Sequence, residues 1–490
     1  MLRASLARTP RGLGRRMSAA APAKKEGDIS DAFVSLSGVD RPPLPDRFRA
    51  LKCDLVRGRE AEIKRSWTQL LRQLRTDNDI IASKGPAVIP QVEYRDLEAG
   101  IDGLKAEIQK RGAVVVKGVV PEAEARAYKE EVEEYIKKNP STRAFPQHDP
   151  QVYELYWSAP QLKARSHPAF LRAQHQLMSR LWHTSSPAAR VSVDHPLTYA
   201  DRLRIRQPGD AAFALGPHVD GGSVERWERA GYGRGAVYDA VFAGRWPDYD
   251  PWDASGRVDA VNNLYDGLGA CTMFRMWQGW LSMSATRPRE GTLLVNPLVK
   301  LSTAYLLLRP FFEAVGAPGT EGYLNEGNWR FTGVEDMTSE LQGATPGTGQ
   351  ELSDGLHPHL ELERTMVHVP EIKPGDYVAW HCDTIHSVDK VHAGTGDSSV
   401  LYIPVCPTTE LNAAYAARQR AAFRAGTPGP DFPGGAGEAA HAGRPSEEMV
   451  RRWGGEAGAR AMGLAPQGVD TGMMDGPREA VERANAALGF

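Results

Sequence analysis

The sequence predicts a mainly β fold with flanking helices (α+β), in which the strands of a barrel bring candidate ligands together. The run at residues 112–118 is rich in valine and bounded by glycines, which is typical of a buried strand. The run at 373–388 begins with a Pro-Gly turn, continues as an apolar strand and places His381 and His386 close together. Segments near both ends of the chain have apolar residues at helical spacing instead. We therefore expect helical extensions around a β core.

The composition is that of a soluble globular enzyme. Hydrophobic residues make up 41% of the chain and charged residues 24%. Lysine and arginine (59 residues) nearly balance aspartate and glutamate (61 residues), so the net charge of −2 gives no indication of a nucleic-acid partner. No apolar run approaches the roughly 18 residues that are needed to span a bilayer. The four cysteines are scattered without a C-x-x-C pair, which argues against a zinc ribbon and fits a reducing compartment.

Residues 1–25 have a composition of their own. They are rich in arginine and lysine, contain interleaved leucines and have no acidic residue before Glu26. This pattern is typical of a mitochondrial transit peptide, and the segment lacks the apolar core of a secretory signal. A disordered basic tail on a cytoplasmic protein is the alternative. We expect residues 1–27 to be a targeting or disordered segment.

The rest of the chain is predicted to divide into three regions. Residues 28–110 have leucines at three- and four-residue spacings and should form helices that pack on the barrel. Residues 111–410 should form the β domain, with glycine-rich insertions near 221–269 and 316–365. Connections of this length are usually functional or form a lid. Residues 411–490 should form a helical extension that includes a Gly/Pro-rich linker.

An arginine-rich strand is predicted shortly before the first candidate ligand. Apolar residues alternate with Arg202, Arg204 and Arg206, as in a strand that presents the arginines on one face. Such a face is usually solvated. Here, however, the strand leads within 12 residues to His218, so one arginine could point into a site. A guanidinium group is well suited to bind a carboxylate.

Two short motifs contain the candidate metal ligands. The motif GPHVDGG supplies His218 and Asp220, and the motif WHCDTIH supplies His381 and His386. Two histidines and one carboxylate form the ligand set of non-haem iron(II) oxygenases, because they occupy one face of the metal and leave the other open. The alternative for H-x-D is a polar turn before two glycines. The H-P-H motif near residue 358 ranks lower, because no strand or third ligand accompanies it.

Longer motifs carry a resemblance to a known family. H-x-D, WLSMSAT with EGTLLVNP, and GDYVAWHCDTIH resemble the phytanoyl-CoA dioxygenase group of iron(II)/2-oxoglutarate oxygenases. The stretches YELYWSAPQLKARSHP, LRIRQPGD before GPHVDGG, and WHCDTIHSVD with SSVLYIP resemble more closely the YbiU-like family of bacteria and fungi, a domain of unknown function. That likeness covers roughly residues 40–425. The resemblance to the broader dioxygenase group implies a double-stranded β-helix core (a jelly-roll, cupin-like fold) with the site in its mouth.

The resemblance also implies a specific ligand set. In the phytanoyl-type pattern the second histidine of H-x-x-x-x-H binds iron, and that histidine is His386 in this sequence. His218 and Asp220 complete the predicted Fe(2+) site. His381 would then lie behind the ligands as a packed or supporting histidine.

The site for 2-oxoglutarate departs from the pattern of the broader group. That group has an arginine about a dozen residues after the last histidine, whereas this sequence reads DSSVLYIP there and offers Ser399 instead. Arg204, Arg206 or Arg275 could supply the positive charge from a neighbouring strand. The remaining alternative is that the chain does not use 2-oxoglutarate.

The resemblance therefore predicts an iron(II)-dependent and 2-oxoglutarate-dependent oxygenase that acts with O2 on an unidentified small molecule. Two alternatives stay open. One is a cupin-like metal-dependent isomerase or another non-redox metalloenzyme, which would form no succinate. The other is a barrel that binds a small molecule without catalysis.

Overall fold

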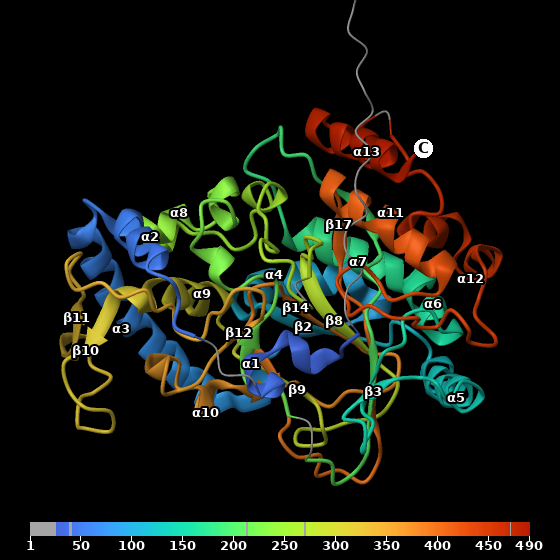
Figure 1. Ribbon diagram of the computed structural model, residues 1–490, viewed down its shortest axis with the longest axis horizontal. Helices are drawn as coiled ribbons and strands as arrows, with labels where there is room; N and C mark the ends of the chain where they lie inside the picture. The colour runs from blue at the N-terminus through green and yellow to red at the C-terminus, as the bar shows by residue number, and fades with distance from the viewer. Residues whose placement is uncertain (1–25, 39–41, 212–213, 269–270, 471) are drawn as a thin grey trace, which may run out of the picture.

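The computed structural model describes residues 26–38, 42–211, 214–268, 271–470 and 472–490. They form a mixed α/β fold in which helices surround an eight-stranded and a five-stranded sheet (Figure 1). The expected combination of helices and strands is confirmed. The description as mainly β is wrong, because the strands are only two to six residues long and the helices cover more of the described chain. The long insertions contribute mostly turns instead of further strands.

The larger sheet is antiparallel except for the parallel pair at one edge. Its strands, in spatial order, are β1 (Gln91–Glu93), β2 (Ala113–Lys117), β14 (Tyr377–His381), β8 (Trp277–Ser282), β16 (Ser398–Tyr402), β6 (Leu203–Arg206), β4 (Val152–Tyr153) and β3 (Ala144–Phe145). The valine-rich run of the sequence is β2. Its side chains from Ala113 to Val116 are fully buried between β1 and β14, as its composition predicts.

The smaller sheet carries the candidate histidine ligands. Its strands, in spatial order, are β12 (Gln350–Glu351), β7 (His218–Val219), β15 (His386–Val388), β9 (Leu293–Val295) and β13 (Val367–His368). All neighbours are antiparallel. His386 pairs directly with His218, so the register of β7 and β15 makes neighbours of two histidines that are far apart in the sequence. The remaining strands form the pairs β10 (Phe312–Ala314) with β11 (Trp329–Phe331) and β5 (Ser192–Leu197) with β17 (Cys406–Thr408).

The two large sheets share a hydrophobic core. Val115, Trp280 and Trp380 of the larger sheet belong to the same buried cluster as Val219 and Val295 of the smaller sheet. Successive side chains of a strand point to opposite faces. The alternate residues of β2, β8 and β14 accordingly lie in a second cluster, together with apolar residues of α4, α5 and α7. Helices therefore cover the outer face of the larger sheet, and its inner face is turned toward the candidate ligands.

Helices precede and follow the strands of the two large sheets in the chain. The α-helices are α1 (Val34–Ser37), α2 (Arg47–Val56), α3 (Glu60–Lys84), α4 (Leu97–Arg111), α5 (Glu122–Lys138), α6 (Ala159–Ser166), α7 (Pro168–Leu181), α8 (Asp239–Phe242), α9 (Val299–Leu308), α10 (Leu362–Thr365), α11 (Glu410–Ala425), α12 (Glu447–Ala461) and α13 (Asp475–Leu488). Among the helices so described, none is long and apolar enough to cross a membrane. Residues 1–25, on which the targeting prediction rests, lie outside the described residues.

The first predicted insertion, near 221–269, is packed into the protein instead of lying over it as a lid. It consists of short 3-10 turns and α8. Its aromatic residues Trp227, Tyr238, Tyr249 and Trp252 are at most 4% exposed, because they pack in the hydrophobic clusters under the sheets. The second insertion supplies β12, the strand that pairs with β7 beside His218. Both insertions therefore support the segments that carry the candidate ligands.

The contact between the N-terminal helices and the β region gives a prediction for stability. Trp67 of α3 is 1% exposed and stacks on Phe312 at 4.3 Å and on Tyr305 at 5.4 Å between ring centroids. Trp67→Ala is expected to lower the free energy of unfolding by about 3–5 kcal/mol, because it removes apolar area and leaves a cavity. Urea unfolding followed by circular dichroism measures this loss. Trp67→Phe keeps most of the contacts and should cost clearly less, so equal losses in the two variants would contradict the prediction.

Candidate metal centre

His218, Asp220 and His386 form a compact cluster whose ligand atoms could hold one metal ion. Asp220 follows the end of β7 and directs its carboxylate toward both histidines. Its Oδ1 lies 3.7 Å from Nε2 of His218, and its Oδ2 lies 3.6 Å from Nε2 of His386. The two imidazole rings are 4.1 Å apart between centroids. The structure therefore brings together the three residues that the sequence predicts as metal ligands.

Backbone carbonyls fix the orientation of both imidazoles. Nδ1 of His218 donates to the carbonyl of Gly216 at 2.8 Å, and Nδ1 of His386 donates to the carbonyl of Thr384 at 3.0 Å. In a neutral ring held this way the proton is on Nδ1, so the lone pair of Nε2 is directed toward the carboxylate of Asp220. This arrangement is the one found for histidines that bind a metal through Nε2.

The charge states of the cluster also suit a metal ion. Burial, and next the neighbouring His386, lower the pKa of His218 to about 4. Burial opposes ionisation of Asp220, but its close contact with His386, together with the neighbouring His218 and Arg275, holds its pKa below the usual range. At neutral pH His218 is therefore neutral and Asp220 is ionised, as ligands of a metal must be.

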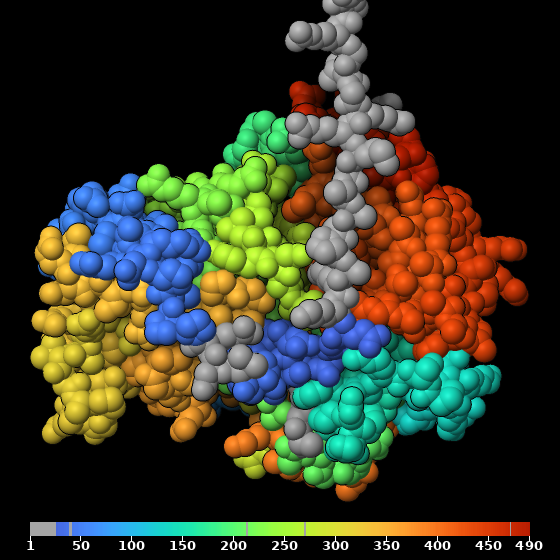
Figure 2. Space-filling view, in the orientation of Figure 1, coloured from blue at the N-terminus to red at the C-terminus, as the bar shows by residue number. Residues whose placement is uncertain are grey.

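The cluster opens into a cavity of about 110 Å³ that lies between the two large sheets. His218, Asp220 and His386 line one side of it, and Arg204, Gln278 and Trp280 of the larger sheet also line it. Residues Ile29, Ala32 and Phe33 reach it from the N-terminal segment. This segment lies on the surface beside the β3–β4 region (Figure 2).

Phe33, in the N-terminal segment, covers one side of the cluster of candidate ligands. Its ring makes an edge contact with the imidazole of His218, with 5.0 Å between centroids. Ala32 accepts a backbone hydrogen bond from Gly349, next to β12, and Ser35 donates to the carboxylate of Glu351. The segment is thus attached to the strand beside β7, and it shields the ligands from solvent.

Two of the candidate arginines reach the cavity. Arg204 of β6 is fully buried and stacks over the ring of Trp280, with 4.7 Å between its Cζ and the ring centroid. Arg275 is 6% exposed and lies 3.9 Å from Oδ2 of Asp220. Burial opposes the charge of Arg275, but the neighbouring Cys271 and Asp220 raise its pKa. Burial lowers the pKa of Arg204, which has no such partner of comparable effect.

The other two candidates for the cosubstrate site do not line the cavity. Arg206 is held by the carboxylate of Asp210 and donates to the carbonyl of Asp389 at 2.6 Å. The hydroxyl of Ser399 donates to Asp397 at 2.5 Å. The side chains of Arg206 and Ser399 are therefore committed to contacts within the protein.

Three donors on the inner face of the larger sheet have no partner in the described part of the protein. They are Nε of Arg204, Nε2 of Gln278 and Nε1 of Trp380, and all three are buried. All three residues line the cavity. A buried donor without an acceptor is costly. The cavity is therefore prepared for a ligand that carries acceptor oxygens.

His381 lies on the opposite face of β14 from the cavity. The preceding residue, Trp380, lines the cavity, and strand alternation turns the next side chain away. The His381 ring stacks on Trp182 at 4.8 Å between centroids, and its Nε2 donates to the carbonyl of Pro251 at 2.9 Å. Within the described ranges it contacts none of the three predicted ligands, so its predicted place directly behind them does not match the structure.

His381, Cys382 and Asp383 form a second group of potential ligand atoms. The carboxylate of Asp383 is already bound by Arg257 and by the hydroxyls of Tyr238 and Tyr249. Burial raises the pKa of the Cys382 thiol to about 12, so the thiolate that a metal requires is disfavoured. The side chains of this group are therefore engaged in contacts within the protein. The histidines of the H-P-H motif are also buried, and His359 packs against Trp67.

Comparison with known proteins identifies the family. A model of the Gig2-like family matches residues 42–464, which is most of the chain. The chain belongs to the Gig2-like family. The Escherichia coli K12 relative named Uncharacterized protein YbiU is 32% identical over 395 residues, or 77% of this chain and 87% of the relative. The predicted membership of a YbiU-like family is therefore confirmed.

Solved structures of Gig2-like proteins share the fold. The Candida albicans protein GIG2 (GlcNAc Inducible Gene 2, DUF1479) is 30% identical with a TM-score of 0.77, over 92% of this chain and 96% of that one. The Escherichia coli protein JW0805 is 31% identical with a TM-score of 0.70, over 86% of this chain and 99% of that one.

Sequence reasoning missed several residues of this Gig2-like site. Gln278 and Trp280 alternate on β8 with Trp277 and Leu281, so the pattern shows a strand but not which face meets the ligands. Phe33 comes from a segment with no motif of its own. Only the three-dimensional arrangement of the sheets and the N-terminal segment reveals these contributions.

Proposed function

We propose that this protein is a non-haem iron(II) oxygenase that uses 2-oxoglutarate to oxidise a small molecule. We also propose that its two large sheets form a double-stranded β-helix. Antiparallel sheets that face each other across a shared core, with ligands on one and a cation on the other, support this description.

The donor set fits iron(II). His218 and His386 offer their Nε2 atoms, and Asp220 offers an ionised carboxylate. This combination suits a divalent iron centre with open positions, and a set rich in thiolates would point to other metals. The open side faces the cavity, where a cosubstrate, a substrate and O2 would have to meet.

The observation that carries the assignment of 2-oxoglutarate is the buried charge of Arg204. Among the described residues no carboxylate lies within ion-pair distance of its guanidinium, which donates only to the carbonyl of Gly291, at 2.9 Å. Burying an unpaired charge costs several kcal/mol, and an anionic ligand would offset that cost. The partnerless Nε of Arg204 and Nε2 of Gln278 would serve a ligand carboxylate.

Arg204 would also take the place of an arginine that the broader group has on the strand corresponding to β16 and that this chain lacks there. In the register of the larger sheet, Arg204 of β6 is the direct neighbour of Val400 on β16. The same wall of the site can therefore receive its positive charge from the adjacent strand. Arg206 lies two residues further along β6 but is paired with Asp210.

Iron(II) and 2-oxoglutarate together supply oxidation of a substrate C–H bond by O2, with conversion of 2-oxoglutarate to succinate and CO2. The protein's residues would supply the rest. His218, Asp220 and His386 would hold the metal, and Arg204 would orient the cosubstrate by its far carboxylate. Phe33 and Trp280 would help to keep water out of the site, which strengthens these electrostatic contacts.

Anaerobic titration tests this proposal. The purified protein should bind one equivalent of iron(II), and added 2-oxoglutarate should then produce the weak visible charge-transfer band of a chelated complex. The band should be absent from His218→Ala, because that variant lacks a ligand. Under air, the iron-loaded protein should form succinate from 2-oxoglutarate. Iron binding without a band or succinate would favour a metal-dependent isomerase or another non-redox enzyme, and no metal binding would favour a binding protein.

A further inference from the structure

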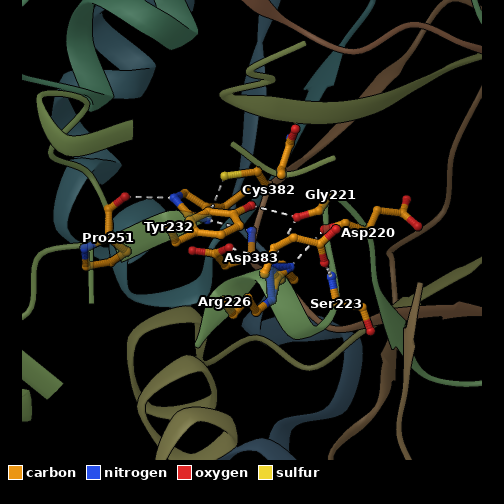
Figure 3. Close-up of polar contacts among 12 residues, drawn as sticks. Asp220, Gly221, Ser223, Arg226, Tyr232, Pro251, Cys382 and Asp383 are labelled. Carbon is orange, nitrogen blue, oxygen red and sulfur yellow. Dashed lines mark hydrogen bonds and ion pairs between the residues drawn. The ribbon is translucent and has the colours of Figure 1, made fainter. Parts of the chain in front are cut away.

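The segment that carries Asp220 is held by a buried arginine from the first insertion. Arg226 donates from Nη2 to the carbonyl of Asp220 at 2.8 Å and from Nη1 to the carbonyl of Gly221 at 3.2 Å. Tyr232 donates its hydroxyl to the same Gly221 carbonyl at 2.6 Å (Figure 3). The side chain of Arg226 is 2% exposed, so water competes little with these hydrogen bonds.

Asp220 needs such support more than the two histidines do. It lies beyond the end of β7, whereas His218 and His386 are residues of paired strands. It is followed by Gly221 and Gly222 with φ of +75° and +88°, a conformation that glycine adopts readily and with much freedom. The backbone at Asp220 is therefore the least constrained part of the ligand set.

The other side of Arg226 faces the turn that leads to His386. Its Nη2 lies 3.9 Å from Oδ1 of Asp383, which is in the connection between β14 and β15. The next residue, Thr384, provides the carbonyl that accepts the hydrogen bond from Nδ1 of His386. Arg226 thus touches the backbone beside one ligand and the turn that orients another.

We propose that Arg226 is a positioning residue of the metal centre, which fixes the backbone of Asp220 relative to the turn that precedes His386. This inference rests on the proposed function, because it requires Asp220 and His386 to be ligands. It extends that function to a residue that does not reach the metal. Partners of this kind, one step behind the ligands, typically change metal affinity about 10- to 100-fold when they are removed.

Arg257 offers a matched control. It binds the same Asp383 carboxylate and is 3% exposed, so Arg257→Met and Arg226→Met each remove a buried cation from one cluster. Within the described residues Arg257 makes no contact with Asp220 or Gly221. Loosening of the turn at Asp383 would affect both variants, whereas loss of the hydrogen bonds to the carbonyls of Asp220 and Gly221 would affect only Arg226→Met.

The experiment is anaerobic titration of the full-length protein with iron(II) and, separately, with cobalt(II), whose visible spectrum reports ligand geometry. Arg226→Met is expected to weaken binding of both metals about 10- to 100-fold and to change the cobalt spectrum. Arg257→Met is expected to change the affinity and spectrum clearly less, because it leaves both hydrogen bonds to Asp220 and Gly221 in place. Tyr232→Phe removes one hydrogen bond to Gly221 and should shift affinity in the same direction by less.

Equal effects in Arg226→Met and Arg257→Met, or none in Arg226→Met, would overturn the inference while leaving the proposed function intact. If Arg226→Met does not fold, Arg226→Lys and Tyr232→Phe decide the question, and unchanged affinity and spectrum in both would overturn it. Failure of the unmodified protein to bind either metal is a different result, which would refute the proposed function itself and this inference with it.

Discussion

His386→Ala is expected to weaken iron(II) binding by about 100-fold or more, which exceeds the usual effect of removing a residue behind the ligands. The variant would keep one imidazole and one carboxylate as ligands. Because His386 is 5% exposed, neighbouring side chains have little room to move in and replace it. Competition with a coloured chelator under anaerobic conditions measures the affinity. Circular dichroism should show that the variant keeps its fold, because the side chain of His386 makes one hydrogen bond, to Thr384, within the described residues.

His381→Ala is the matched control for this experiment. It removes a histidine only five positions earlier in the same motif, and that ring is buried beside Trp182 and away from the cavity. We expect it to reduce stability through lost packing but to leave the iron(II) affinity of the folded protein unchanged. A loss of affinity as large as that of His386→Ala would show that the wrong histidine has been assigned.

The candidate ligands could be predicted because the ligand residues occur in short sequence motifs. H-x-D places His218 and Asp220 on the same side of a chain in extended conformation, and the second motif contains only two histidines to choose between. The structure separates these two by strand alternation. Trp380 faces the cavity, so His381 faces away, and the chain must turn before His386 can point inward.

The choice among arginines could not be made from the sequence. Arg204 and Arg206 are alternate residues of one strand, both fully buried, and their pattern is identical. They differ because Asp210, in the turn after the strand, pairs with Arg206, whereas no carboxylate in the described part of the chain pairs with Arg204. Loop conformation decides this, and periodicity does not report it.

The proportion of helix could not be predicted from the sequence pattern either. The strands around the site are short, and the length of the first insertion predicts a functional segment or a lid. In the structure its tyrosines and tryptophans are buried, and Arg226 donates a hydrogen bond to the backbone carbonyl of Asp220. An aromatic, glycine-rich sequence is compatible both with a surface lid and with an irregular part of the core, because both require the same turns.

The largest effect expected on the cosubstrate comes from Arg204→Met, which keeps the apolar stem of the side chain over Trp280 but removes the charge. Truncating one partner of a buried charged pair typically costs about 2–5 kcal/mol, so binding of 2-oxoglutarate should weaken by about 30-fold or more. Iron(II) affinity should persist, because Arg204 makes no contact with His218, Asp220 or His386 among the described residues. Titration of the iron-loaded variant with 2-oxoglutarate, followed through the visible band, measures the change.

Arg275→Met is the comparison that makes this result specific. Arg275 lines the same cavity and is also cationic, but it lies beside Asp220 at 3.9 Å and therefore near the metal. If Arg204 binds the far carboxylate, Arg275→Met should alter the affinity for iron(II) more than the affinity of the loaded site for 2-oxoglutarate. The reverse ranking of the two variants would move the cosubstrate carboxylate to Arg275. Equal and small effects would mean that neither arginine binds it, and the unpaired charge of Arg204 would then have to serve the substrate instead.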